Sequence, residues 1–152
     1  MTPVWPDAPR VGPARPFPAY AFVPGRTPRP PEPEGEPRHV PPERWREDPA
    51  YLFGIDLYHA GYLWEAHEQW EGIWKASADD TQRHFLQGLI QLAAALLKLR
   101  MGNARGAGKL AARAHAHLAH VRGERYMGLA LAPLRAFLEG PRAEDAPRLV
   151  PR

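Results

Sequence analysis

The sequence contains no cysteine and a single serine, Ser77. The lack of cysteine excludes disulfides, thiolate zinc sites and a cysteine nucleophile. Ser77 lies at an expected helix end without the strand-to-helix turn that exposes the catalytic serine of many hydrolases. The chain also has no glycine-rich phosphate loop and no dinucleotide-binding fingerprint. These absences argue against nucleophilic and nucleotide-dependent enzymes, and we favour a non-enzymatic protein.

Long apolar runs are missing as well. The longest, residues 92–97, is far shorter than the roughly 20 residues that a membrane-spanning helix needs. The first thirty residues contain prolines and arginines but not the apolar centre of a signal peptide. We therefore expect a soluble, cytoplasmic protein with no membrane partner.

Proline is abundant but unevenly placed. Fifteen of the 19 prolines precede Tyr51, and each one removes a backbone donor and holds its predecessor extended. This predicts a Pro-rich extended arm over residues 1–48, a helical domain over 49–140 and a tail over 141–152. Within the arm, the aromatic residues of RPFPAYAFVPG predict an irregular strap against the body, and residues 28–39 predict a mobile linker.

Helical periodicity and capping residues dominate the body. Asp48 followed by Pro49 is typical of a helix start, and Gly61 and Gly102 are typical of helix ends. These signals predict helices over residues 49–60, 62–76, 80–101 and 104–121, and a short one over 133–140. The third is apolar on most sides, which places it at the centre. The predicted fold class is all-α, an antiparallel bundle of four long helices and a short fifth.

The densest group of polar and aromatic side chains lies in WEAHEQWEGIW, residues 64–74. His67, Glu71 and Trp74 are spaced so that they line one face of the expected second helix. The expected third helix presents a polar line of its own. We infer one polar cluster between these two helices, formed by His67, Glu68, Glu71, Trp74, His84, Gln87 and Gln91.

We favour a structural interpretation of this cluster. Glu71 would accept a hydrogen bond from His67 or from an amide such as Gln87, and Trp74 would cover the pair. Losing one partner of such a buried pair typically costs about 3–5 kcal/mol. The cluster would therefore clasp the second helix to the third.

A divalent-metal site is the alternative, with His67 and Glu71 as ligands and Glu68 or His84 as a possible further one. Imidazole nitrogen and carboxylate oxygen one helical turn apart suit Zn²⁺, Mn²⁺ or Fe²⁺, and an open coordination position would permit hydrolysis. However, HEQWE lacks the second histidine of the HExxH zinc-protease motif, and the paired Glu-x-x-His helices of di-iron bundles are missing. We therefore expect no cofactor as the first interpretation.

Two linked segments resemble a known family. The spacing of His67, Glu71 and Trp74 in EAHEQWEGIW resembles the H-x-x-x-E-x-x-W signature of the bacterial and archaeal domain-of-unknown-function family numbered 309. The following FLQGLIQLAAALLKLRMGNARGA is similar to the long third helix and Gly-Asn turn of that family. The resemblance covers about residues 51–118 and implies a small all-helical bundle. It implies no activity, because the family is named for lacking one.

Basic residues raise one more alternative. Arg105, Lys109 and Arg113 recur every four residues on the expected fourth helix, a stripe suited to the phosphates of anions or nucleic acid. No aromatic residues interleave with the stripe, which favours a solvated helix face. The histidines of HAHLAH, residues 115–120, do not share one face, and we interpret them as surface residues.

The sequence thus predicts a small, non-enzymatic helical protein that acts as an interaction or scaffold module. A homodimer is an assembly that this interpretation allows. Two alternatives stay open: a metal-binding protein or metal-dependent hydrolase, and a protein that binds anions or nucleic acid.

Overall fold

The computed structural model describes residues 2–31 and 37–152, and helices dominate them. The long elements are α1 (Pro49–His59), α2 (Leu63–Ala76), α3 (Asp80–Arg100), α4 (Ala104–Leu118) and α5 (Leu131–Glu139). Two 3-10 turns, η1 (Pro42–Glu47) and η2 (Ala143–Asp145), flank them within the described residues, and a small hairpin, β1 (Arg125–Tyr126) with β2 (Leu129–Ala130), precedes α5. The all-α fold class is confirmed, whereas the hairpin and the 3-10 turns were not expected.

Local signals begin and end most helices as predicted. The side chains of Asp48, Asp79 and Asn103 each accept a hydrogen bond from a backbone N–H in the first turn of α1, α3 and α4. Gly61 and Gly102 have φ of 92° and 80°, and they turn the chain after α1 and α3. The helix connections therefore follow from residues that lie next to them in the sequence.

Two helix ends differ from the prediction. α4 stops at Leu118 rather than near residue 121, and Arg135 of α5 donates to the carbonyl oxygens of Leu118 and Val121 at 3.1 and 2.8 Å. α5 begins at Leu131, two residues before Pro133, and the Leu131 N–H donates to the Glu124 carbonyl. In both cases a group from another element satisfies the backbone at a helix end.

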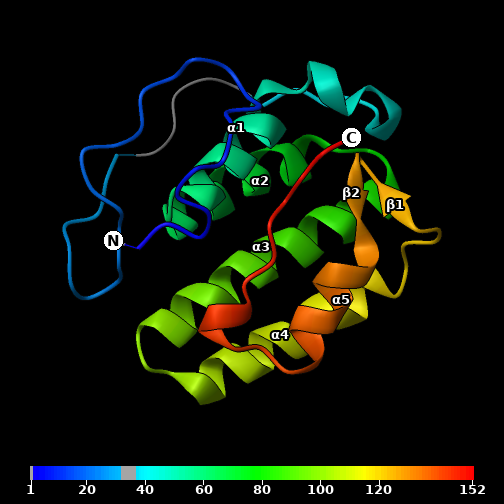
Figure 1. Ribbon diagram of the computed structural model, residues 1–152. Coiled ribbons are helices and arrows are strands. Elements are labelled where there is room, and N and C mark those ends of the chain that lie inside the picture. The colour runs from blue at the N-terminus through cyan, green and yellow to red at the C-terminus, as the bar shows by residue number, and fades with distance from the viewer. Residues whose placement is uncertain (1, 32–36) are drawn as a thin grey trace.

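α3 lies at the centre, with α2 along one side and α4 along the other (Figure 1). α1 packs on α2, and α5 packs on α4. Because α3 has neighbours on two sides, its apolar residues are buried around most of its circumference. The fully buried residues of α3 include Phe85, Leu86, Leu89, Leu92 and Leu96. Along the described residues, no helix is both long and apolar enough to cross a membrane.

α1 and α2 cross closely at Gly54. A Cβ atom at this position would lie 2.3 Å from Nε1 of Trp70. The Trp70 indole is fully buried, and its N–H donates to the Tyr51 carbonyl at 3.2 Å. The indole therefore cannot move aside without losing a buried hydrogen bond, and only glycine leaves room for it.

Gly54→Ala is expected to lower the free energy of unfolding by about 2 kcal/mol, because overpacking a tight core contact typically costs 1–3 kcal/mol and outweighs the better helix propensity of alanine. Urea denaturation measures this. The control is Gly108→Ala at an exposed position of α4, where nothing lies within 4 Å of the added Cβ. This variant is expected to gain about 0.5–1 kcal/mol in the free energy of unfolding. An unchanged urea midpoint for Gly54→Ala would contradict the close crossing.

The N-terminal arm lies along α1 and α2 (Figure 1). The Phe17 ring lies 6.2 Å from that of Phe53 and 5.3 Å from that of Tyr62, between ring centroids. Phe22 is buried and meets Trp64 edge to face at 5.0 Å. Aromatic contacts thus hold the irregular segment around residues 17–22 on the helices.

The linker predicted for residues 28–39 falls partly on residues 32–36, which lie outside the described residues. On one side of that gap, the Arg29 guanidinium lies 5.6 Å from the centre of the Trp64 ring. On the other side, Nδ1 of His39 accepts a long hydrogen bond of 3.4 Å from the backbone before α3. The described ends of the linker therefore both contact the helical body.

Asp56 of α1 anchors the arm. Its carboxylate is buried and accepts hydrogen bonds from the backbone N–H groups of Val11 and Gly12 at 2.8 and 2.9 Å. The guanidinium of Arg10 completes the arrangement, with Nε 2.9 Å from Asp56 Oδ2. One carboxylate thus organises three consecutive residues of the arm.

His59, one turn further along α1, holds the other end of the chain. Its Nε2 accepts a hydrogen bond of 2.9 Å from the Leu149 N–H, and the Tyr58 hydroxyl donates to the Pro147 carbonyl at 2.8 Å. Leu149 is only 1% exposed. The segment 141–152, predicted as a tail, therefore packs on the body, because Leu149 and its N–H find an apolar contact and a buried acceptor there.

Candidate functional site

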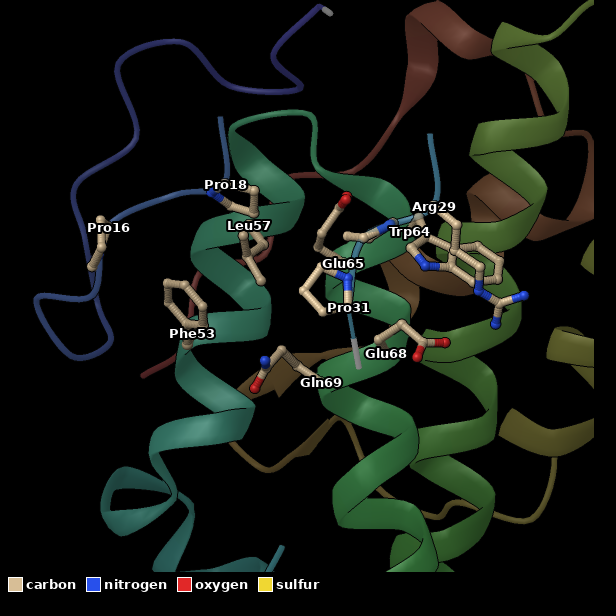
Figure 2. A pocket seen from close by; sticks show the side chains of 11 residues that line it. Pro16, Pro18, Arg29, Pro31, Phe53, Leu57, Trp64, Glu65, Glu68 and Gln69 are labelled. Carbon is tan, nitrogen blue, oxygen red and sulfur yellow. The ribbon is translucent and has the colours of Figure 1, made fainter. Parts of the chain in front are cut away.

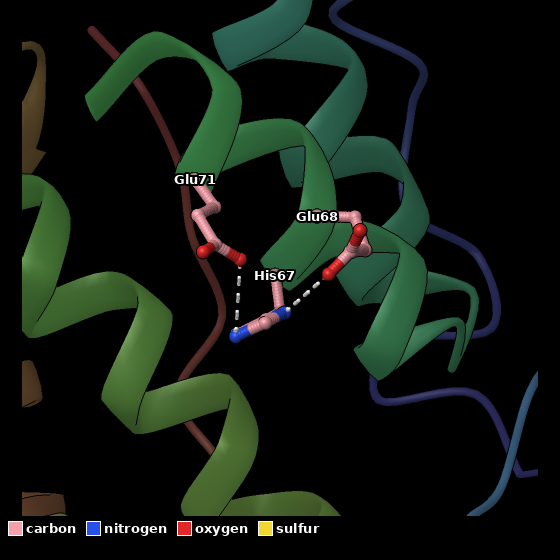
Figure 3. Close-up of side chains that lie close together, drawn as sticks. All are labelled: His67, Glu68 and Glu71. Carbon is pink, nitrogen blue, oxygen red and sulfur yellow. Dashed lines mark ion pairs between the residues drawn. The ribbon is translucent and has the colours of Figure 1, made fainter. Parts of the chain in front are cut away.

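His67 lies between two carboxylates of its own helix (Figure 3). Its Nδ1 is 3.3 Å from Glu68 Oε1, and its Nε2 is 3.8 Å from Glu71 Oε2. The second distance is too long for a hydrogen bond, and Nδ1 of His67 has no hydrogen-bond partner in the described part of the chain. The three side chains are 20–34% exposed. The arrangement is a loose, half-buried ion pair rather than a tight clasp.

The predicted polar cluster is divided between separate places. Gln87 accepts a hydrogen bond of 3.4 Å from Gln91 along α3, and no contact described in the structure joins Gln87 to Glu71. The buried face of α2 consists of Leu63, Ala66, Trp70 and Ile73. Because His67 and Glu71 are each one position beyond that apolar face, they lie at its edge instead of inside the α2–α3 interface.

Trp74 does join α2 to α3. The Arg83 guanidinium lies 4.4 Å from the centre of the Trp74 ring. Nη1 of Arg83 also donates to the carbonyl oxygens of Trp74 and Ser77 at 2.7 and 3.3 Å. Arginine thus ties the end of α2 to the start of α3 through both stacking and hydrogen bonds. Sequence reasoning did not single out Arg83.

Three of the four predicted metal ligands lie together. One ligand atom from each of His67, Glu68 and Glu71 lies within 4.8 Å of the other two. A tetrahedral site with bonds of 2.0–2.1 Å has ligand atoms only about 3.3 Å apart, so the side chains would have to close in. His84, the other possible ligand named from the sequence, is not part of this group, and metal binding by His67, Glu68 and Glu71 stays a prediction.

His84 instead meets two histidines at the end of α4. Its Nδ1 lies 3.0 Å from Nδ1 of His117, and its ring stacks on that of His120 with centroids 4.0 Å apart and planes 10° apart. Burial, followed by the neighbouring imidazoles of His84 and His120, lowers the pKa of His117. The HAHLAH segment was interpreted as surface, but the three-residue spacing of His117 and His120 could have indicated a shared face.

A cavity of about 250 Å³ lies between the arm and helices α1 and α2 (Figure 2). Its polar wall residues are Arg29, Glu65, Glu68 and Gln69. Most of the remaining wall is proline, aromatic or aliphatic, and this part includes Pro16, Pro18, Pro31, Phe53, Leu57 and Trp64. The cavity exists only because the arm lies on the helices. The sequence does not determine where the arm lies, so it could not reveal the cavity.

Glu65 contributes a buried carboxylate oxygen to this wall. Its Oε2 accepts a hydrogen bond of 2.9 Å from the Phe22 N–H, whereas its Oε1 is buried and has no hydrogen-bond partner within the described ranges. Burial raises the pKa of the Glu65 carboxyl. A buried acceptor without a donor costs about 1–3 kcal/mol, and more when it is charged. The site therefore favours either a proton on Glu65 or a donor brought by a ligand.

The predicted basic stripe lies where the sequence placed it. Arg105, Lys109 and Arg113 are exposed along one side of α4. Within residues 2–31 and 37–152, no hydrogen bond or ion pair engages these three side chains. Binding of anions or nucleic acid at this stripe stays a prediction.

The comparison with family models bears on the helical segment that carries these residues. Residues 51–110 match the family Domain of unknown function (DUF309). The matched segment covers α1, α2, α3 and the first half of α4, and includes His67, Glu71 and Trp74. The DUF309 resemblance seen in the sequence is thereby confirmed. No curated protein and no solved structure matches the chain. The proposed function therefore depends on the geometry of the sites.

Proposed function

We propose that this protein is a non-enzymatic interaction module that binds a small apolar ligand carrying an ammonium group in the cavity beneath its N-terminal arm. The observation that carries the proposal is Oε1 of Glu65, a buried carboxylate oxygen without a hydrogen-bond donor among the described residues, in a wall that is mostly apolar. An ammonium group would supply that donor and would favour the ionised carboxylate.

Charge and shape support a cation. Two carboxylates, Glu65 and Glu68, and one guanidinium, Arg29, lie on the cavity wall (Figure 2). The rings of Trp64 and Phe53 lie 5.6 Å from the guanidinium groups of Arg29 and Arg15, so these rings already attract cations. A volume of about 250 Å³ lies near the small end of ligand pockets, and it suits one ring with a short amine chain.

Binding is favoured over catalysis because of what lines the cavity. Its described lining offers carboxylates, one amide and one guanidinium, but no hydroxyl, imidazole or amine. Of the usual covalent nucleophiles the wall offers only carboxylates, and Glu65 already accepts a hydrogen bond from the Phe22 N–H. In this proposal His67, Glu71 and Trp74 have an architectural role at the edge of the α2–α3 interface.

The matched probes 2-phenylethylamine and 2-phenylethanol test the proposal at pH 7. Wild type is expected to bind the amine at least about tenfold more tightly, because a hydrogen bond to a charged group contributes about 1.5–3 kcal/mol. NMR titration, with the Trp64 indole N–H as the local reporter, measures both affinities. Glu65→Gln is expected to remove the preference for the amine.

Glu71→Gln, a change of carboxylate outside this cavity, serves as the control and is expected to keep the preference. Equal affinity of wild type for the amine and the alcohol would contradict the proposal. So would shift changes confined to residues far from Trp64.

A second candidate function is divalent-metal binding by His67, Glu68 and Glu71. It is favoured by the approach of one ligand atom from each residue to within 4.8 Å of the others. Zn²⁺ binding by untagged protein that is lost in His67→Ala would support it. Homodimer formation stays a prediction, because the structure describes a single chain.

A further inference from the structure

Three imidazoles from two helices gather at one end of the α3–α4 interface. His84 lies in the first turns of α3, whereas His117 and His120 lie at the end of α4 and in the turn that follows it. The two helices approach closely beside them, since a Cβ atom at Gly88 would lie 2.6 Å from Cδ2 of Leu118. Gly88 is one turn beyond His84, and Leu118 directly follows His117. The close crossing therefore holds the two imidazoles against each other.

The distance between Nδ1 of His84 and Nδ1 of His117 is 3.0 Å. Two ligand nitrogens with metal bonds of 2.0–2.1 Å are about 2.9 Å apart at a right angle and about 3.3 Å apart in a tetrahedron. The pair thus already has the spacing of two adjacent metal ligands. The group on α2 has three ligand atoms within 4.8 Å of one another, whereas the histidine pair has two nitrogens already at ligand spacing.

Metals bind the neutral form of imidazole. In the described part of the chain, no carboxylate forms an ion pair with His84, His117 or His120. The lowered pKa of His117 follows from burial and from the two neighbouring imidazoles. A hydrogen bond between two neutral rings is the alternative account of the 3.0 Å pair. The ring of His120, stacked on His84 at 4.0 Å, brings a third imidazole beside the pair.

We propose that His84 and His117 bind a divalent transition-metal ion of the Zn²⁺ and Cu²⁺ type, with His120 as a third ligand. Imidazole ligands suit these ions, and a divalent ion would replace the hydrogen bond between the two Nδ1 atoms. His120 is exposed, and its nearly parallel ring must rotate to direct a nitrogen at the ion. Water fills the remaining positions. The site is independent of the cavity beneath the arm.

Calorimetric titration of the untagged protein with ZnCl₂ at pH 7.5 tests the proposal. One Zn²⁺ per chain is expected, and His84→Ala or His117→Ala is expected to weaken binding by about 100-fold or more, since even outer-shell changes at metal sites cost 10–100-fold. His120→Ala is expected to have a smaller effect, about tenfold. In long-range ¹H–¹⁵N NMR spectra, the Nδ1 signals of His84 and His117 are expected to shift on zinc addition.

His115→Ala is the matched control, because His115 lies on the same helix and faces Glu139 at 3.6 Å instead; unchanged binding is expected. His84→Gln keeps the side chain polar and similar in length, so a loss of zinc binding in this variant is not explained by misfolding. Absence of Zn²⁺ binding, or binding that survives both His84→Ala and His117→Ala, overturns the proposal. Loss of binding in His67→Ala alone would overturn it too, and would place the metal on α2.

Discussion

Replacing Asp56 with alanine is expected to lower the free energy of unfolding by about 3 kcal/mol and to release the N-terminal arm. The change leaves the N–H groups of Val11 and Gly12 and the guanidinium of Arg10 without their shared acceptor. Removing one partner of a buried ion pair typically costs 3–5 kcal/mol, and the lower end applies because the Arg10 side chain is 40% exposed. Urea denaturation measures the loss.

Limited trypsin digestion measures the release of the arm. Arg15 and Arg29 each precede a proline and resist trypsin, so the cleavable sites of this part of the arm are Arg10 and Arg26. Rapid cleavage at Arg10 and Arg26 is expected in Asp56→Ala. Arg10→Ala is the control: it leaves the carboxylate with its two backbone donors and is expected to cost about 1 kcal/mol or less, because exposed ion pairs contribute little. Trypsin resistance of Asp56→Ala equal to that of wild type would show that the carboxylate is not the anchor.

Asp56→Ala also connects the fold to the proposed function. The arm supplies the prolines that form one wall of the cavity, so an arm that has left the helices cannot enclose a ligand. The variant is therefore expected to lose binding of 2-phenylethylamine together with protease resistance. Zinc binding at His84 and His117 is expected to persist, because that site lies between α3 and α4 and contains no residue of the arm.

Acidification from about pH 6.5 to pH 4 is expected to remove about 3 kcal/mol of stability through His59. Burial lowers the pKa of His59 from 6.5 to about 4, with Asp56 opposing the shift and Arg148 adding to it. Because the unfolded chain takes up the proton at the higher pH, stability falls as the pH drops through this window. The 2.5-unit difference corresponds to about 3 kcal/mol at 1.36 kcal/mol per unit. Below about pH 4, no further loss from this group is expected.

Protonation has a structural consequence at the end of the chain. Nε2 of His59 accepts the Leu149 N–H, and a protonated nitrogen cannot accept. A lower protection factor for amide hydrogen exchange at Leu149 is therefore expected as the pH approaches 4, and urea midpoints between pH 7 and 4.5 measure the global effect. The side chain that replaces His59 in His59→Gln does not titrate, so this variant is expected to lose less stability on acidification than wild type. The lowered pKa of His117 affects both proteins equally. Identical pH profiles for the two proteins would contradict the assignment.

Much of the fold was predictable because its signals are local. Asp48, Asp79 and Asn103 cap helices that follow them directly, and Gly61 and Gly102 supply the positive φ that ends α1 and α3. The apolar circumference of α3 also predicted its central position. These features depend on residues within one or two turns of each other, where spacing alone determines which side chains meet.

The candidate sites were less predictable because each combines distant residues. His84 was expected to meet His67 across the α2–α3 interface, yet it meets His117, 33 residues away. Periodicity shows which residues share a face of one helix, but not which helix covers that face or how closely. Gly88 decides the matter here, since it lets α4 approach α3 beside the histidines.

Polar residues inside apolar helices were a signal that sequence reasoning left unused. Asp56 and His59 interrupt the apolar stretch YLFGIDLYHA, and buried polar groups need partners. The partners, Gly12 and Leu149, lie near opposite ends of the chain. A polar residue at a buried position indicates that a hydrogen-bond partner exists, but the amino-acid sequence does not identify that partner.

The sequence by itself determined an all-α protein with a Pro-rich arm and a central third helix, because helix periodicity, capping and proline geometry act over a few residues. It also revealed the resemblance to DUF309, which the family match over residues 51–110 confirms. Only the tertiary structure decided that His67 pairs along its own helix, that three histidines meet between α3 and α4, and that the arm encloses a cavity over Glu65. Those outcomes depend on the packing of segments far apart in the chain, where contacts follow from the shapes of whole faces rather than from local spacing.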